Sequence, residues 1–131
     1  MSLHNSEINL IVEELLSKII PGIVQKVSHA GSCGFILQIH FSKITERLFI
    51  DLQSGYSRLH LVQDDYEKRK EPTSFCMLLR KHLLQKKCVE ILQVNQDRIV
   101  KAVFQGEEGQ IFLFCELFGN KNSIVLTDSE L

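Results

Sequence analysis

The strongest constraint on the fold is the way apolar residues alternate with other residues in short segments. In one segment, Phe35, Leu37, Ile39 and Phe41 occupy every second position. Successive side chains of a β-strand point to opposite faces of a sheet, so this spacing predicts a strand with one apolar face. Similar segments, bounded by turn-forming residues, predict eight strands in two blocks: 23–29, 35–41, 46–52 and 56–62, then 88–93, 98–105, 110–118 and 122–127.

A helix is predicted before each block of strands. Residues 7–20 place apolar side chains at spacings of three and four residues, which puts them on one stripe of a helix that Pro21-Gly22 ends. The second helix is predicted over 74–86, with Thr73 as its N-cap. Its expected inner face consists of Phe75, Leu78, Leu79, His82 and Leu83. This order favours an α+β fold, an antiparallel β-sandwich of two packed sheets with flanking helices.

Composition narrows the class of protein. A chain of 131 residues, 44% of them hydrophobic, has the size of one domain over residues 1–131 with a sizeable core. Its net charge is -1, so a nucleic acid would have to bind a local basic patch. No apolar run reaches the roughly 20 residues that span a bilayer, and no secretory signal precedes the first helix. We therefore expect a cytoplasmic protein, without membrane contact, whose cysteines are buried free thiols: Cys33, Cys76, Cys88 and Cys115.

Catalytic and metal-binding motifs are missing from the sequence. We find no phosphate-binding loop, no dinucleotide fingerprint, no His-Glu-x-x-His and no cysteine or histidine pairs at zinc spacing. Residues 31–34 (Gly-Ser-Cys-Gly) join two predicted strands, and this composition is typical of a hairpin turn rather than of a nucleophile turn. The sequence thus favours a protein that is not an enzyme and that needs no cofactor or metal.

Two isolated polar residues occupy positions expected to be apolar. His82 falls on the inner face of the second helix, and we interpret it as a hydrogen-bonded core histidine rather than a metal ligand. Glu116 interrupts an apolar strand, where a carboxylate is costly unless it has a partner. We expect a basic side chain or backbone donors beside Glu116; a catalytic acid is the alternative interpretation.

Basic and aromatic side chains form three candidate binding groups. Arg80 and Lys81, with Lys86 and Lys87, form the polar side of the second helix. On one predicted strand, Tyr56, Arg58 and His60 share a face, which suits base stacking and phosphate contact but also an ordinary solvated face. Asp97 and Arg98 are neighbours near a strand start. Their side chains are expected to point apart and to serve separate partners.

These residues belong to a longer pattern that resembles a known family. The pattern consists of Tyr56 to Leu61, Pro72 with Phe75 to Leu83, Gln93 with Asp97 to Val100, and Glu116-Leu117 with Gly119. It is similar to the N-terminal domain of the NFACT family, also called the fibronectin-binding protein A N-terminal domain, which heads the RqcH and NEMF proteins. The resemblance covers essentially the whole chain in the family's order. Its most specific part is the block from Phe75 to Leu83.

The resemblance carries expectations for fold and function. It implies a fold like the N-terminal domain of formamidopyrimidine-type DNA glycosylases, without their activity, because Ser2-Leu3 replaces the Pro-Glu start of those enzymes. It also implies binding of tRNA and of the large ribosomal subunit that carries a stalled nascent chain. Within the family the Asp-Arg pair is implicated in tRNA recognition, which points here to Asp97 and Arg98. Arg58, His60, Arg80 and Lys81 match further motif positions and complete the expected RNA-binding set.

The chain also departs from the family pattern. His4-Asn5 stands where Asp-Gly is usual, Asn95-Gln96 replaces Gly-Phe, and Asn120 to Ser123 differs from Arg-x-Ser-Asn. Because family proteins are several times longer, we expect an excised domain or a truncated homologue. Three alternatives therefore stay open: a fibronectin-binding adhesin domain, a DNA-processing enzyme, and a degenerate homologue that serves as a protein-interaction module.

Overall fold

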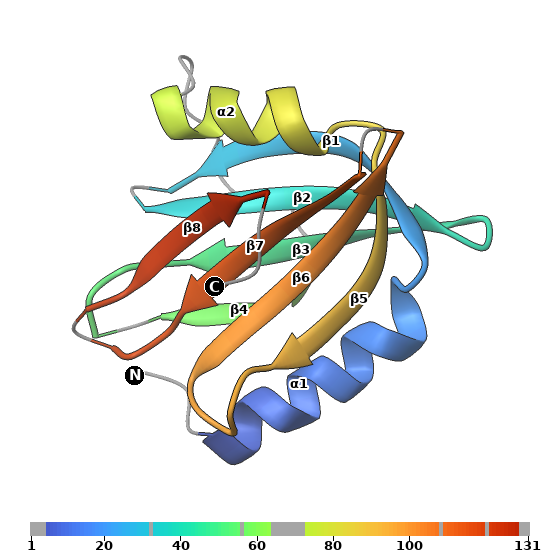
Figure 1. The fold of residues 1–131 in the computed structure, drawn as a ribbon. Coiled ribbons are helices and arrows are strands. Elements are labelled where there is room, and N and C mark those ends of the chain that lie inside the picture. The colour runs from blue at the N-terminus through green and yellow to red at the C-terminus, as the bar shows by residue number, and fades with distance from the viewer. Residues whose placement is uncertain are drawn as a thin grey trace.

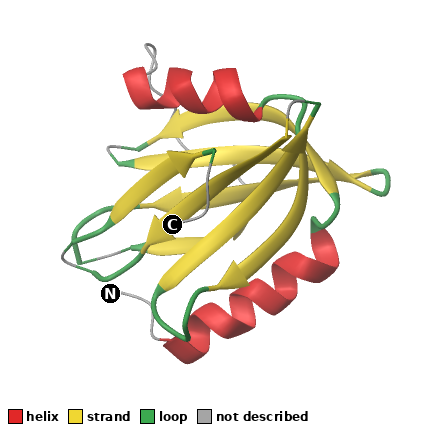
Figure 2. Ribbon diagram, viewed as in Figure 1, coloured by secondary structure: helices red, strands yellow, loops and turns green. Residues whose placement is uncertain are grey.

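The computed structural model describes residues 5–31, 33–55, 57–63, 73–107, 109–119 and 121–128. Figures 1 and 2 show how their helices and strands are arranged. The elements of these described residues are α1 (Asn5–Lys18), β1 (Gly22–Ala30), β2 (Gly34–Phe41), β3 (Ile44–Asp51), β4 (Arg58–Val62), α2 (Ser74–Leu83), β5 (Lys87–Gln93), β6 (Ile99–Gly106), β7 (Gly109–Glu116) and β8 (Ser123–Thr127). All eight predicted strands are confirmed, and so is the antiparallel α+β class.

The strands form one continuous sheet in the order β4-β3-β2-β1-β5-β6-β7-β8. Each half is a meander of sequential hairpins, and only two residue pairs, Gly22 with Cys88 and Ile23 with Lys87, join β1 to β5. Because this junction is so short, the sheet folds over there and its two halves face each other (Figure 1). The prediction of two separate packed sheets is therefore wrong in connectivity, since backbone pairing links the halves.

Gly22 makes the corner between the halves possible. A Cβ atom at this position would lie 2.5 Å from the carbonyl oxygen of Ile19 and 2.5 Å from Cγ2 of Ile39. Both distances are too short for any side chain, and the Ile19 oxygen belongs to the backbone and cannot turn away. The close approach of the end of α1, β1 and β2 at the corner thus requires glycine.

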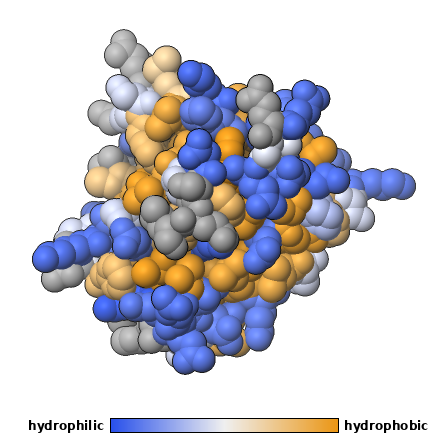
Figure 3. Space-filling view, in the orientation of Figure 1, coloured by the Kyte–Doolittle hydropathy of each residue, from blue (hydrophilic) through white to orange (hydrophobic). Residues whose placement is uncertain are grey.

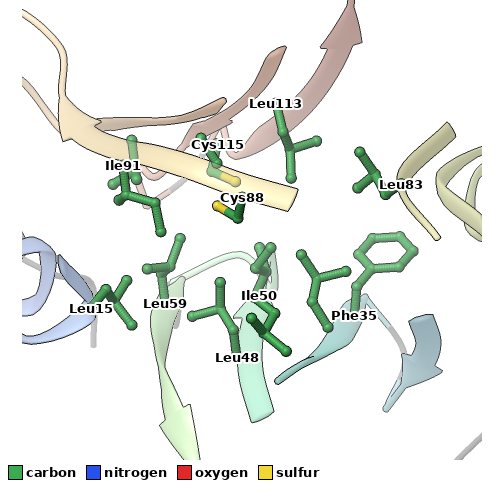
Figure 4. Close-up of a cluster of buried hydrophobic side chains, with 14 of the residues drawn as sticks. Leu15, Phe35, Leu48, Ile50, Leu59, Leu83, Cys88, Ile91, Leu113 and Cys115 are labelled. Atoms are coloured by element: carbon green, nitrogen blue, oxygen red, sulfur yellow. The ribbon is translucent and has the colours of Figure 1, made fainter. Parts of the chain in front are cut away.

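The core fills the space between the two half-sheets. Figure 4 shows side chains from the first half and from α1 pointing toward those of the second half, with Leu15, Leu48, Ile50 and Leu59 opposite Cys88, Ile91, Leu113 and Cys115. Each such side chain is at most 4% exposed. Full burial of an aliphatic side chain of this size contributes about 1.5–3 kcal/mol, so this shared core is what holds the halves face to face.

The cysteines divide into one exposed and three buried thiols. Cys76, Cys88 and Cys115 are buried free thiols, as predicted. Burial raises the pKa of both Cys88 and Cys115 to about 12, because the apolar core disfavours a thiolate. Cys33 is exposed in the β1–β2 turn, so the prediction of burial is wrong for this residue. Turn residues project from the sheet and reach no core.

Each helix covers one open side of the folded sheet. The stripe of Ile8, Val12, Leu15 and Ile19 buries α1 against β5 and β4, as the spacing predicted. α2 lies across β1 on the other side (Figure 1). Neither described helix has the length and apolar composition needed to cross a membrane.

α2 differs from its prediction in its face and in its length. Thr73 is its N-cap, with Oγ1 accepting a hydrogen bond from the Cys76 amide at 3.2 Å. The buried face consists of Cys76, Leu79 and Leu83, whereas Leu78 is 40% exposed. The helix ends at Leu83 rather than at 86, because Gln85 donates its backbone N–H to Val24 of β1. Contact with the sheet thus overrides the local preference for a longer helix.

Candidate nucleic-acid interface

The Asp97-Arg98 pair lies in the tight connection between β5 and β6. Asn95 and Gln96 both have positive φ angles, 52° and 57°, and the Asp97 amide donates to the Val94 carbonyl at 2.9 Å. Two successive left-handed residues form the turn whose twist matches that of a hairpin. The turn therefore places Asp97 and Arg98 at the end of the sheet, directly before β6.

Local hydrogen bonds fix the position of Asp97. Its carboxylate Oδ1 accepts from the backbone N–H of Arg98 at 2.7 Å, and its carbonyl accepts from the Gln93 side-chain amide at 2.7 Å. The Asp97 side chain is nevertheless exposed. This arrangement presents a carboxylate to solvent at a defined place, where it can accept hydrogen bonds from a bound partner.

The side chain of Arg98 rests on an aromatic ring. Its guanidinium carbon lies 5.7 Å from the ring centroid of Phe118, and its carbonyl accepts from the Leu117 amide at 2.8 Å. A cation over a ring face is attracted by the π electrons, here at a half-buried position. Within the described residues no ion pair joins Asp97 to Arg98, and the assignment of separate partners to the two side chains stays a prediction.

Asn122 connects the loops of this region through hydrogen bonds of its side chain. It was not predicted as a functional residue. Its side-chain oxygen accepts from the Gly119 amide at 2.7 Å, while its Nδ2 donates to the carbonyls of Leu52 and Gln53 at 3.1 and 3.2 Å. An asparagine amide can both donate and accept, so one side chain connects two loops. In the sequence, this position stands out only as part of a departure from a family pattern. An asparagine shortly after a glycine between two strands was the available signal.

We call this end of the molecule the loop end and define it as residues 52–55, 94–98, 117–119 and 121–122. Gly55 adds a backbone link, because its amide donates to the Gly119 carbonyl at 2.7 Å. Arg58 follows closely at the start of β4, where it is exposed. The loop end therefore gathers Asp97 and Arg98 in one region of the surface, with Arg58 beginning the strand that leaves it.

His60 is held by structural contacts. Its ring packs edge-on against Phe49 with centroids 5.8 Å apart, and its Nδ1 lies 3.0 Å from the Leu61 carbonyl oxygen. Tyr56, the first member of the predicted aromatic and basic face, lies outside the described residues. The described remainder of that face thus offers one exposed cation, Arg58, beside a half-buried imidazole.

The two basic candidates on α2 lie far from the loop end. α2 covers the opposite side of the folded sheet from α1 and the β5–β6 connection (Figure 1). Arg80 is half-buried and donates through Nε to the Val27 carbonyl of β1 at 2.9 Å, so the prediction that it belongs to a solvated polar face is wrong. It anchors the helix to the sheet. Lys81 is exposed. The structure therefore separates the predicted RNA-binding set into two regions.

Two further expectations are corrected. His82 is only half-buried and borders the surface, because α2 turns Cys76 rather than His82 toward the core. Glu116 has a partner, but the partner is a hydroxyl: Ser123 donates through Oγ to the Glu116 carboxylate from the adjacent strand β8. Among the described residues, no three His, Cys, Asp or Glu side chains gather in a way that could hold a metal ion.

The surface around these elements is mixed in character. In the orientation of Figure 1, hydrophilic and hydrophobic residues alternate in patches over the outer face of the second half-sheet (Figure 3). An ion pair joins Lys18 to Glu14 on α1, at 3.8 Å. Local basic groups can therefore act as separate binding points on a nearly neutral chain.

Several known proteins are similar to this chain in sequence or in fold. A protein named Rqc2 homolog RqcH from Streptococcus pneumoniae is 32% identical over 98% of this chain, which spans 24% of that protein. The human ribosome quality control complex subunit NEMF is 39% identical over 60% of this chain, which spans 7% of it. The N-terminal domain of the fibronectin-binding protein PavA from Streptococcus pneumoniae superposes with a TM-score of 0.90 at 32% identity, over 98% of this chain and 52% of that one.

The match to a family covers nearly all of the sequence. Residues 6–131 fit the family described as NFACT N-terminal and middle domains. The match includes both helices, both half-sheets and the loop end with Asp97 and Arg98. The chain therefore belongs to the NFACT family.

Proposed function

We propose that this chain is a non-catalytic domain that binds tRNA within a ribosome-associated quality-control factor. In this proposal the whole factor acts in the cytoplasm on large ribosomal subunits that carry a stalled nascent chain. The kinship with RqcH and with a subunit of the human ribosome quality control complex supports the cellular setting. The observation that carries the RNA contact is the presentation, on one tight turn, of an exposed, hydrogen-bonded Asp97 carboxylate next to a half-buried Arg98 that rests on Phe118.

The chemistry of the pair suits an RNA loop. A guanidinium donates to phosphate oxygens or to a base edge, and a carboxylate accepts from the amino group of a base. Because Asp97 and Arg98 do not neutralise each other, both groups remain available to a ligand. Phe118 supports the guanidinium from one side and so reduces the conformational freedom that Arg98 loses on binding. Arg58 would add electrostatic attraction.

Direct binding to bulk tRNA tests this proposal. Fluorescence anisotropy across a salt series would compare the wild type with an Asp97→Ala/Arg98→Ala variant, whose net charge is unchanged. The matched control is Glu14→Ala/Lys18→Ala, which removes an exposed ion pair on α1. We expect the first variant to lose about tenfold in affinity, the effect of roughly 1.4 kcal/mol, and the control to bind normally. Equal affinities for all three proteins would refute the assignment of the site.

Fibronectin binding is the second candidate, favoured by the similarity to the PavA domain. Surface plasmon resonance on immobilised fibronectin tests it with the same three proteins. Saturable binding of the wild type in the absence of any tRNA affinity would replace the first proposal with the second. Binding to neither ligand would leave two alternatives, a protein-interaction module and a DNA-processing enzyme.

A further inference from the structure

A groove with charged side chains in its lining lies at the other end of β6 from Asp97 and Arg98. It is a groove of about 410 Å³ between the last turn of α2 and the β6–β7 hairpin. This volume lies within the range of about 300–1,000 Å³ that is typical of ligand-binding pockets. We call it the α2 groove and define it by six lining residues: Lys81, His82, Lys86, Gly106, Ile111 and Asp128.

The charge of the α2 groove favours an anion. Lys81 and Lys86 contribute two ammonium groups and His82 an imidazole, against one carboxylate from Asp128. Among the described residues, neither lysine forms an ion pair with that carboxylate or with any other. Glu107 is exposed in the adjacent hairpin turn and does not line the groove. Both ammonium groups are therefore available to a phosphate.

The backbone holds Lys86 firmly in place. Its amide donates to the Leu83 carbonyl at 3.0 Å, and its carbonyl accepts from the Val24 amide at 3.0 Å. Its side chain then crosses Gly106: a Cβ atom on that glycine would lie 3.0 Å from Lys86 Cδ and Cε and 3.1 Å from Nζ. The glycine leaves room for the lysine stem along the hairpin, so the ammonium group is directed along the wall of the groove.

We propose that the α2 groove binds phosphate groups of an RNA backbone and forms a second contact for the tRNA of the proposed function, on which this inference rests. Lys81 and Lys86 would neutralise phosphates, while His82 and Ile111 would face the adjoining ribose. β6 runs from Ile99, next to Arg98, to Gly106 at the groove. At about 3.3 Å per residue, the two contact points are roughly 25 Å apart. One nucleotide cannot span this distance. A ligand that touches both contact points must therefore be a larger RNA whose folded structure extends at least this far.

The test neutralises the groove without shortening its side chains. A Lys81→Gln/Lys86→Gln variant would be compared with the control Lys18→Gln/Lys43→Gln, which removes two lysines outside both sites. Each phosphate contact contributes about 0.7–0.9 to the slope of log affinity against log salt. We expect the groove variant to bind tRNA at least fivefold more weakly at low salt. We also expect the magnitude of its slope of log affinity against log salt to be smaller by about 1.5. A slope equal to that of the control would overturn the proposal.

The Asp97→Ala/Arg98→Ala variant separates this inference from the proposed function. Loss of tRNA binding in that variant, with a normal groove variant, would keep the proposed site and reject the α2 groove. The reverse result would keep the groove and reject Asp97 and Arg98. A wild type that binds no tRNA would reject both.

Chemical-shift mapping with tRNA as the probe supplies an independent readout. We expect the Gly106 and Gly109 amides to shift in the wild type and not in the groove variant. Unchanged glycine shifts in saturated wild type would contradict the groove contact.

Discussion

The two halves of the sheet meet at two junctions that are built in opposite ways. At the corner, β1 and β5 meet through backbone pairing at Gly22 and Ile23, and no side chain fits at position 22. At the loop end the Asn122 side chain bonds the β3–β4 connection to the β7–β8 connection, beside a single backbone hydrogen bond from the Gly55 amide to the Gly119 carbonyl. The corner requires that position 22 has no side chain, whereas the loop end relies on the side chain of Asn122.

This difference has a consequence for function. The corner tolerates no substitution at position 22, since a Cβ atom there would collide with the Ile19 carbonyl oxygen. The loop end can change its ties while the core stays intact, because Asn122 is only half-buried and its partners are backbone groups. Variation that alters ligand recognition is therefore tolerated better at the loop end, where Arg98 lies.

The largest expected effect is at the corner. A Gly22→Ala substitution places a Cβ atom 2.5 Å from backbone oxygen, and we expect it to lower the free energy of unfolding by about 3 kcal/mol. Urea denaturation measures this loss. Gly31→Ala is the matched control, because position 31 has open space and a φ of 64°, so it carries only a left-handed backbone cost of about 1–2 kcal/mol. Equal losses in the two variants would show that the corner is not tightly packed.

An intermediate effect is expected for the side-chain junction. Asn122→Ala removes the donor to Leu52 and Gln53 and the acceptor for Gly119, so we expect a loss of about 2 kcal/mol in the free energy of unfolding. The neighbouring exposed Lys121→Ala should change it by less than about 0.5 kcal/mol. If the two substitutions cost the same, Asn122 does not join the halves.

The smallest effect concerns the core that lies between the junctions. The pKa of Cys115 is raised from 9.0 to about 12 by burial, so the folded state keeps a proton that the unfolded state loses above pH 9. The contribution of this thiol to the free energy of unfolding is fully present below pH 9 and is lost as the pH rises toward 12. At pH 10 the loss from one such thiol is about 1.4 kcal/mol. Cys115→Ala should therefore lessen the decline in the free energy of unfolding between pH 8 and 10, to which Cys88, whose pKa is raised in the same way, continues to contribute. A decline in the Cys115→Ala variant as steep as that of the wild type would contradict this effect of burial.

Local sequence patterns predicted the helices and strands well, but they could not predict which strands pair across a long separation in the chain. Alternation in some segments and a continuous apolar run in 110–118 helped to identify the eight strands, since both patterns depend only on neighbours in the chain. The β1–β5 pairing joins positions 22 and 88, which no local window contains. The α2 face was also predicted incorrectly: Leu78 was assigned to the core by its hydrophobicity, whereas the side of the helix that packs on the sheet carries Cys76, Leu79 and Leu83.

The candidate site was predictable in part. The Asp97-Arg98 motif and its turn could be located from the sequence, and the assignment of separate partners to the two side chains stays a prediction. The role of Asn122 could not be predicted, because its partners Leu52 and Gln53 lie about 70 residues away in the chain. Arg80 was misinterpreted for the same reason, since its acceptor is the Val27 carbonyl of a distant strand.

The order of the strands also determines how the chain can reach this structure. Every neighbouring pair in the sheet except β1–β5 joins strands that are consecutive in the sequence. Consecutive hairpins close short loops and form on the microsecond scale, whereas joining Gly22 to Cys88 must overcome the entropy of a long loop. The corner pairing should therefore form late, after both meanders. A substitution at Gly22 would then raise the unfolding rate far more than it lowers the folding rate.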